Sequence, residues 1–178
     1  MKAHIFAEGS NTTEENRTKP SKEYFQGLFN LVTGLTDDIS KSADTNLHVL
    51  SEEFGVLRGD QVITDASGSE QDNSTDLWES AQEELLTAAK EADVMVILLS
   101  TNGFDNTVGE IWTELVEEAK PDSIWCIGVA QSRLNSLNFK TLEKKGCSII
   151  TYQRVGVAHI GKDTRQELLE TVAQKASK

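Results

Sequence analysis

Short apolar segments alternate with amphipathic segments along almost the whole chain. Five segments are strand-like: residues 3–7, 47–50, 94–99, 124–129 and 148–152. Segment 94–99 is apolar without alternation, which is typical of a strand covered on both faces. Strands that alternate with helices form parallel sheets. The order predicts a three-layer α/β fold, Rossmann-like, with about five mostly parallel strands, helices on both faces and segment 94–99 in the interior.

Two of the amphipathic segments have apolar stripes at helical spacing. The first stripe consists of Leu77, Ala81, Leu85, Ala88 and Ala89. The second consists of Val108, Ile111, Trp112, Leu115, Val116 and Ala119. We expect both helices to pack on the sheet through these stripes.

Length and composition limit the organisation of the chain. Its 178 residues, 38% of them hydrophobic and 26% charged, are typical of one globular domain, so we expect a single domain over residues 1–178. Residues 8–20 and 64–74 lack periodicity and are rich in polar residues. We expect two long loops there, which are either functional or mobile.

The charge and the two cysteines bear on partners and compartment. The formal charge of −12 disfavours general binding of duplex nucleic acid. No apolar run approaches the roughly 20 residues that span a bilayer, and the start of the chain lacks the features of a secretory signal, so we expect a cytoplasmic protein without membrane contact. Cys126 and Cys147 each lie in an apolar segment, which favours buried, unbridged thiols.

Polar and small residues follow each predicted strand. Ligands of open α/β sheets bind outside the carboxyl ends of the strands, so these residues are the candidate site. Among the candidate residues named below, serine and asparagine side chains could hydrogen-bond a ligand. A phenylalanine could stack on a base, and two arginines could bind phosphate. For any single glycine or serine, a simple turn of the chain is an alternative explanation. The candidate ligand-binding residues are Ser10, Ser51, Phe54, Ser100, Asn102, Arg133 and Arg154.

Glu110 admits two interpretations. It lies at the start of the second predicted helix, where a carboxylate facing the crevice could act as nucleophile or stabilise an oxocarbenium-like centre during cleavage of an N-glycosidic bond. Alternatively, Thr107 and Glu110 have the spacing of a capping box, in which each side chain bonds the other residue's backbone N–H. The sequence leaves both open.

Other motif classes are absent from the sequence. His4, His48 and His159 share no metal-binding spacing, and we propose no metal; His159 follows the last predicted strand and could titrate near the crevice, although an ordinary loop histidine explains it too. The chain has no P-loop, no dinucleotide-binding glycine pattern, no nucleophile elbow and no CxxC motif. We predict no cofactor.

Three stretches resemble elements of known families. Lys22-Glu-Tyr-Phe-Gln-Gly-Leu-Phe29 and Leu47-His-Val-Leu-Ser-Glu-Glu-Phe-Gly-Val-Leu57 resemble elements of small α/β proteins that are themselves similar to the uracil-DNA-glycosylase-like domains of archaeal tRNA-guanine modification enzymes. More weakly, Asn102-Gly-Phe-Asp-Asn-Thr-Val-Gly-Glu110 resembles the phosphate loop of nucleotide phosphoribohydrolases. Both resemblances imply nucleotide or nucleobase chemistry.

The leading hypothesis is therefore a protein that binds a nucleotide, nucleoside or nucleobase at the carboxyl edge and that could cleave or exchange an N-glycosidic bond through Glu110. The alternative is a non-catalytic binding or interaction protein that uses the α/β domain as a scaffold. Whether the protein is an enzyme stays open, as does its oligomeric state.

Overall fold

The computed structural model describes residues 1–8, 29–51, 55–58, 74–153 and 162–177. Its strands are β1 (Lys2–Glu8), β2 (Asp44–Ser51), β3 (Gly55–Arg58), β4 (Val94–Leu98), β5 (Ile124–Val129) and β6 (Ser148–Gln153). Its helices are α2 (Phe29–Ile39), α4 (Ser74–Glu91), α5 (Thr101–Asn106), α6 (Val108–Glu118), α7 (Gln131–Ser136), α8 (Lys140–Lys144) and α9 (Lys162–Ala176).

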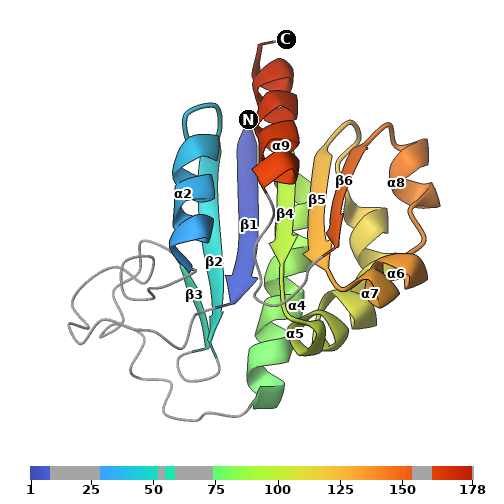
Figure 1. Cartoon of the computed structure of the whole chain (residues 1–178). Helices are drawn as coiled ribbons and strands as arrows, with labels where there is room; N and C mark the ends of the chain where they lie inside the picture. Colours follow the sequence, from blue (N-terminus) through green and yellow to red (C-terminus); the bar gives the residue numbers. More distant parts are fainter. Residues whose placement is uncertain (9–28, 52–54, 59–73, 154–161, 178) are drawn as a thin grey trace.

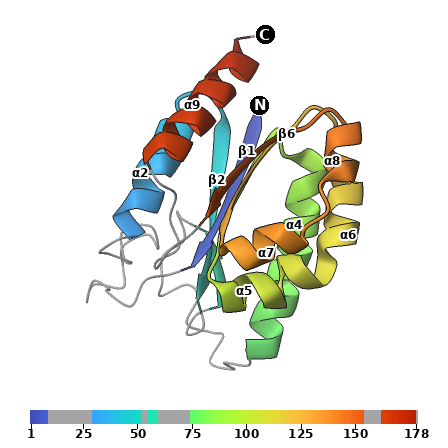
Figure 2. The ribbon, with the colours of Figure 1, turned by 45° about the vertical axis from the view of Figure 1, so that its right-hand side comes forward.

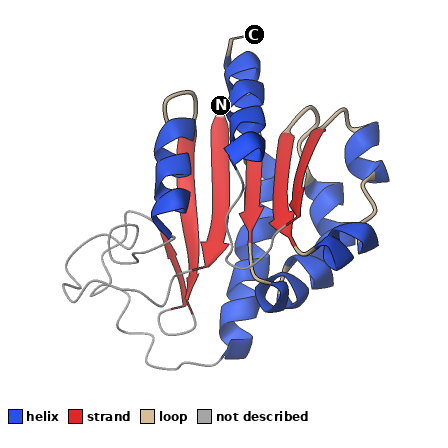
Figure 3. Cartoon of the chain, in the orientation of Figure 1, coloured by secondary structure: helices blue, strands red, loops and turns tan. Residues whose placement is uncertain are grey.

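The strands form one sheet in the order β3-β2-β1-β4-β5-β6, as labelled in Figure 1, and Figure 3 shows them in red. Neighbouring strands are parallel except β2 and β3, which pair antiparallel. All five predicted strands are present, and β4 lies between β1 and β5, so the prediction of an interior strand is confirmed. Gly55–Arg58 was not predicted to be a strand, but it forms β3, a four-residue strand at one edge of the sheet.

Helices cover both faces of the sheet, which confirms the three-layer, Rossmann-like α/β fold (Figures 1 and 2). Helices α2 and α9 lie on one face, whose buried hydrophobic side chains are aliphatic apart from Cys126, and we call it the aliphatic face. Helices α4, α6 and α8 lie on the other, which buries Phe6, Phe104, Trp112 and Trp125, and we call it the aromatic face. Both predicted apolar stripes are buried on this aromatic face.

The two thiols differ in their surroundings. Cys126 lies in β5, is fully buried and is unbridged. Burial, reinforced by the negative charge of Glu167, raises its pKa to about 12. Cys147 is also unbridged but only half-buried, because it precedes β6 instead of lying within it, and its Sγ is 3.3 Å from Ser123 Oγ. The prediction that both thiols are buried is therefore wrong for Cys147.

Two findings concern the described residues only. None of the described helices is long and apolar enough to cross a membrane. In the same part of the chain, no group of three or more His, Cys, Asp or Glu side chains is arranged to hold a metal ion. The expected loops at 8–20 and 64–74 lie outside the described residues, except for Glu8, which ends β1, and Ser74, which begins α4. The expectation of a single domain stays a prediction.

Candidate functional site

Among the strands that the structure describes, the carboxyl edge of the sheet has one topological switch point, between β1 and β4. The two strands are parallel neighbours, with Ala7 paired to Leu98 at their carboxyl ends. The chain crosses from β1 to β2 through α2 on the aliphatic face, whereas it crosses from β4 to β5 through α5 and α6 on the aromatic face. Because the connections leave in opposite directions, this is the place where an open α/β sheet forms a ligand crevice.

A carboxylate bridges the ends of the two strands at this point. Glu8 Oε1 accepts a hydrogen bond from the backbone N–H of Ser100 at 2.9 Å and another from the Ser100 hydroxyl at 2.6 Å. The Ser100 hydroxyl in turn accepts the N–H of Gly103 at 3.1 Å and caps α5. The arrangement places a hydrogen-bonded carboxylate, with its charge, at the switch point.

Gly103 is required for this arrangement. A Cβ atom at this position would lie 2.0 Å from Glu8 Oε1 and 3.3 Å from Ser100 Oγ. Any larger residue would therefore displace the Glu8 carboxylate.

An ion pair joins α5, which follows β4, to α7, which follows β5. Arg133 on α7 donates from Nε to Asp105 Oδ1 at 2.7 Å and from Nη2 to Asp105 Oδ2 at 2.8 Å. Hydrogen bonding by the guanidinium holds the pKa of Asp105 below its usual value. Arg133 is therefore engaged by a bidentate carboxylate of the protein itself.

The predicted site residues are only partly brought together. Ser10, Phe54 and Arg154 lie outside the described residues. Ser100 is at the switch point, and Ser51 is buried at the carboxyl end of β2.

Asn102 is exposed on α5. Its backbone carbonyl and its Oδ1 both accept from the Asn106 side chain. Both oxygen atoms of Asn102 therefore already accept a hydrogen bond within α5. Its role as a ligand contact, like the roles of the other candidate residues, stays a prediction.

The structure does not form the capping box that was one of the two interpretations of Thr107 and Glu110. Thr107 is the N-cap of α6 and is fully buried, but its hydroxyl donates to the carbonyl of Gly103 at 2.6 Å. It makes no side-chain cap bond to α6 because its hydroxyl is turned back toward α5. Glu110 is exposed in the first turn of α6.

Glu8 was given no separate role on the basis of the sequence, although its carboxylate bonds Ser100 at the switch point. Glu8 stood among the residues that follow the first predicted strand. Its partner lies 92 positions away along the chain, so only the pairing of β1 with β4 identifies the contact.

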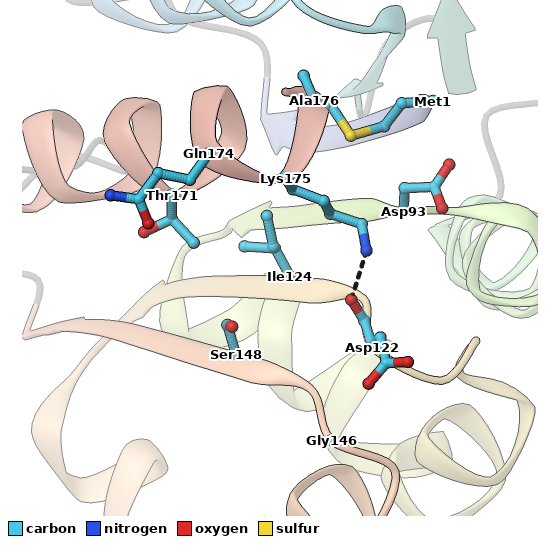
Figure 4. Close-up of a pocket in the computed structure, with 10 residues that line it drawn as sticks. All are labelled: Met1, Asp93, Asp122, Ile124, Gly146, Ser148, Thr171, Gln174, Lys175 and Ala176. Carbon is cyan, nitrogen blue, oxygen red and sulfur yellow. Dashed lines mark hydrogen bonds between the residues drawn. The ribbon is translucent and has the colours of Figure 1, made fainter. Parts of the chain in front are cut away.

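A polar cavity of about 860 Å³ lies at the opposite, amino edge of the sheet (Figure 4). Its lining includes Asp93, Asp122, Gly146 and Lys175, and Lys175 Nζ donates to the Asp122 carbonyl at 2.6 Å. Asp122 has a φ of 62°, and a Cβ at Gly146 would lie 2.5 Å from the Asp122 carboxylate. The cavity lies away from the edge where sheets of this kind bind ligands.

No family model and no curated protein matches the chain. Among solved structures, the chain is similar to a diflavin flavoprotein from Nostoc sp., with 9% identity and a TM-score of 0.44, over 99% of this chain and 91% of that one. It is also similar to a flavodoxin from the domain Archaea, with 14% identity and a TM-score of 0.40, over the full length of both chains.

These neighbours correct the functional hypothesis drawn from the sequence. They are flavin proteins, and neither is a uracil-DNA glycosylase or a nucleotide phosphoribohydrolase. The expectation of a nucleotide, nucleoside or nucleobase ligand with N-glycosidic chemistry is therefore wrong, whereas the site assignment of Glu110 stays a prediction. The sequence resemblances on which it rested stay untested predictions.

Proposed function

We propose that the protein binds a small ligand in the crevice between the carboxyl ends of β1 and β4. The observation that carries the proposal is the sheet order, which makes the crossovers on either side of this point leave on opposite faces. Sheets of this construction bind their ligands at the switch point because the diverging connections leave a gap there.

The charge at the switch point indicates the chemistry of the ligand. The Glu8 carboxylate is an acceptor, so it favours a ligand that presents hydroxyl or N–H donors and repels a phosphate placed against it. Arg133 provides no free guanidinium for a phosphate, because Asp105 engages it through two hydrogen bonds. The ligand is expected to contact Glu8 through a neutral group rich in donors.

A flavin satisfies this description and is the ligand we propose. The parallel strands follow the order β2-β1-β4-β5-β6, which is the order of flavodoxin-like sheets that hold a flavin at the corresponding switch point. A flavin carries hydroxyl groups on its side chain and an imide N–H on its ring, and both are donors that a carboxylate can accept.

Titration of the purified protein with riboflavin and with flavin mononucleotide tests the proposal. Thermal unfolding followed by circular dichroism gives the stabilisation, which should reach about 2.7 kcal/mol at 100 times the dissociation constant. Adenosine and adenosine monophosphate serve as negative controls. If neither flavin shifts the midpoint at millimolar concentration, the proposed ligand is wrong.

Two variants locate the flavin. Gly103→Ala displaces the Glu8 carboxylate without removing its charge, and Glu8→Gln removes the charge without changing its size. Both should weaken flavin binding, whereas Glu110→Gln, which changes an exposed carboxylate on α6, should leave it unchanged. Equal binding by all three variants would place the flavin elsewhere.

We also infer that the protein works in a reducing compartment such as the cytoplasm. The support is that Cys126 and Cys147 are both unbridged. A thiol titration of the denatured, unreduced protein should return two free thiols per chain, and none would contradict the inference.

A further inference from the structure

Four ionisable side chains form a continuous chain of contacts on the aromatic face, between α4 and the strands β1 and β2. His4 Nε2 lies 2.8 Å from Glu91 Oε1, and His4 Nδ1 lies 2.9 Å from His48 Nε2. His48 Nδ1 lies 3.2 Å from Glu84 Oε2. The two imidazole side chains are only 7% and 10% exposed, whereas the two glutamates are 42% and 40% exposed. The series of contacts thus leads from one partly exposed carboxylate through two buried imidazole rings to a second partly exposed carboxylate.

The number of hydrogens needed by these contacts exceeds the number that two neutral imidazoles supply. Each of the three contacts needs one hydrogen between its heavy atoms, and an ionised carboxylate supplies none. Two neutral imidazoles supply two. We propose that His4 and His48 together form a proton-binding site, in which the folded protein holds one hydrogen more than two neutral rings carry.

The surroundings assign the additional proton to His48. Burial lowers the pKa of His4, and the charge of His48 lowers it further, while hydrogen bonding to Glu91 opposes this. His4 is therefore neutral, donates from Nε2 to Glu91 and accepts at Nδ1. His48 is then the imidazolium, which donates from Nε2 to His4 and from Nδ1 to Glu84.

Other charged groups lie around the pair on three elements. From β1, Lys2 Nζ lies 3.0 Å from Glu91 Oε2. From β3, Arg58 pairs with His48 across the strands. Glu84 and Glu91 both come from α4, and the Phe6 ring stacks on His48 with its centroid at 4.2 Å. The two carboxylates are therefore in direct contact with the imidazole rings, and the Lys2 ammonium is paired with one of these carboxylates.

The proposal gives the contribution of the pair to stability a maximum near pH 6.5, the ordinary pKa of histidine. Above this pH the unfolded rings are neutral while the folded pair holds one proton, so stability falls as the pH rises towards the point where the pair loses it. Below it the unfolded rings hold two protons and the folded pair one, so stability also falls as the pH drops. Each unmatched proton changes the unfolding constant by about tenfold per pH unit.

Imidazole nitrogen NMR of the full-length protein at pH 7.5 tests the proposal directly. At this pH an ordinary histidine is about one-tenth protonated. The parent protein should show both nitrogens of His48 protonated and His4 as the neutral Nε2–H tautomer. Finding an unprotonated Nδ1 on His48 in the parent would overturn the proposal.

A matched pair of variants on α4 separates this site from general charge effects. In Glu84→Gln the amide can donate to Nδ1 of a neutral His48, so the third hydrogen comes from glutamine and His48 should become neutral. Glu83→Gln removes the same charge from an exposed neighbour and should leave the His48 signals unchanged. If His48 stays protonated in Glu84→Gln, or loses its proton equally in Glu83→Gln, the proposal is wrong.

Discussion

The two faces of the sheet are covered by different kinds of contact. On the aliphatic face, α2 and α9 bury alanine, valine, leucine and isoleucine, which have no directional requirements. On the aromatic face, each buried indole also makes a hydrogen bond: Trp125 Nε1 donates to Ser123 Oγ, and Trp112 Nε1 donates to the Asn138 carbonyl. Aliphatic packing tolerates small rearrangements, whereas an aromatic ring with a polar partner has one favoured position. The aromatic face should therefore respond more strongly to substitution.

The largest effect is expected from Trp125→Ala on the aromatic face. Trp125 is 1% exposed, and its ring meets Trp112 edge-on with centroids 6.2 Å apart. Loss of the indole should lower the free energy of unfolding by about 3 to 5 kcal/mol, measured by urea denaturation with circular dichroism. Trp125→Phe, which keeps an aromatic ring, should cost less. A loss below about 1 kcal/mol for Trp125→Ala would show that this face repacks freely.

A smaller loss is expected from Leu168→Ala on the aliphatic face. Leu168 of α9 is fully buried in the aliphatic cluster. We expect a loss of about 2 to 3 kcal/mol, at the lower end of the range for leucine, because aliphatic neighbours can partly close the cavity. The same urea denaturation measures it. A cost equal to that of Trp125→Ala would remove the proposed difference between the faces.

Asp93 and Asp38 form ion pairs that differ in the exposure of the carboxylate, so their substitution can be compared. Asp93, after α4, accepts from Lys120 Nζ and from the Lys2 backbone N–H, both at 2.8 Å, and its side chain is 16% exposed. Asp38 on α2 pairs with Arg165 on α9 and is 31% exposed. Asp93→Asn should cost about 1 to 2 kcal/mol, and Asp38→Asn less than about 1 kcal/mol. The reverse order in urea denaturation would contradict the comparison.

The pH dependence of these two pairs has the same sign. Burial raises the pKa of Asp93, but hydrogen bonds from Lys120 and the Lys2 backbone outweigh it, so the pKa is lowered overall. Hydrogen bonding by Arg165 lowers the pKa of Asp38. Both carboxylates therefore contribute fully above the ordinary value of 3.8, and lose their contribution as the pH falls through the lowered values. Stability measured from pH 6 to pH 2 should fall less steeply in Asp93→Asn than in the parent.

The smallest expected effect is a gain from Gly34→Ala in α2. A Cβ there would meet Arg165 Nη2 at 3.5 Å, an ordinary contact distance. Alanine restricts the unfolded chain and favours the helix, so the free energy of unfolding should rise by up to about 1 kcal/mol. A lower free energy of unfolding in the same denaturation experiment would show that the space beside α9 is already filled.

The sequence predicted the elements whose pattern is local and missed those defined by contacts. Uninterrupted apolarity at 94–99 indicated an interior strand, and helical spacing indicated the stripes of α4 and α6, because burial acts on each segment separately. The strand β3 was missed because four residues that begin with glycine carry too short a pattern. At the candidate site, Ser100 was found because it follows β4, whereas Glu8 gained its role only through a contact between strand ends. Thr107 has the spacing of a capping box, but its hydroxyl bonds the preceding turn instead.

The location of the tryptophans has a consequence for spectroscopy. The chain has three, and Trp78, Trp112 and Trp125 all pack in the cluster of the aromatic face. Their fluorescence therefore reports on that side of the sheet, while the side chains buried beneath α2 and α9 include no indole. If α2 and α9 detach before the rest of the molecule, the emission will stay native while the far-ultraviolet signal already declines. Superimposable curves from the two probes would mean that both layers unfold as one cooperative unit.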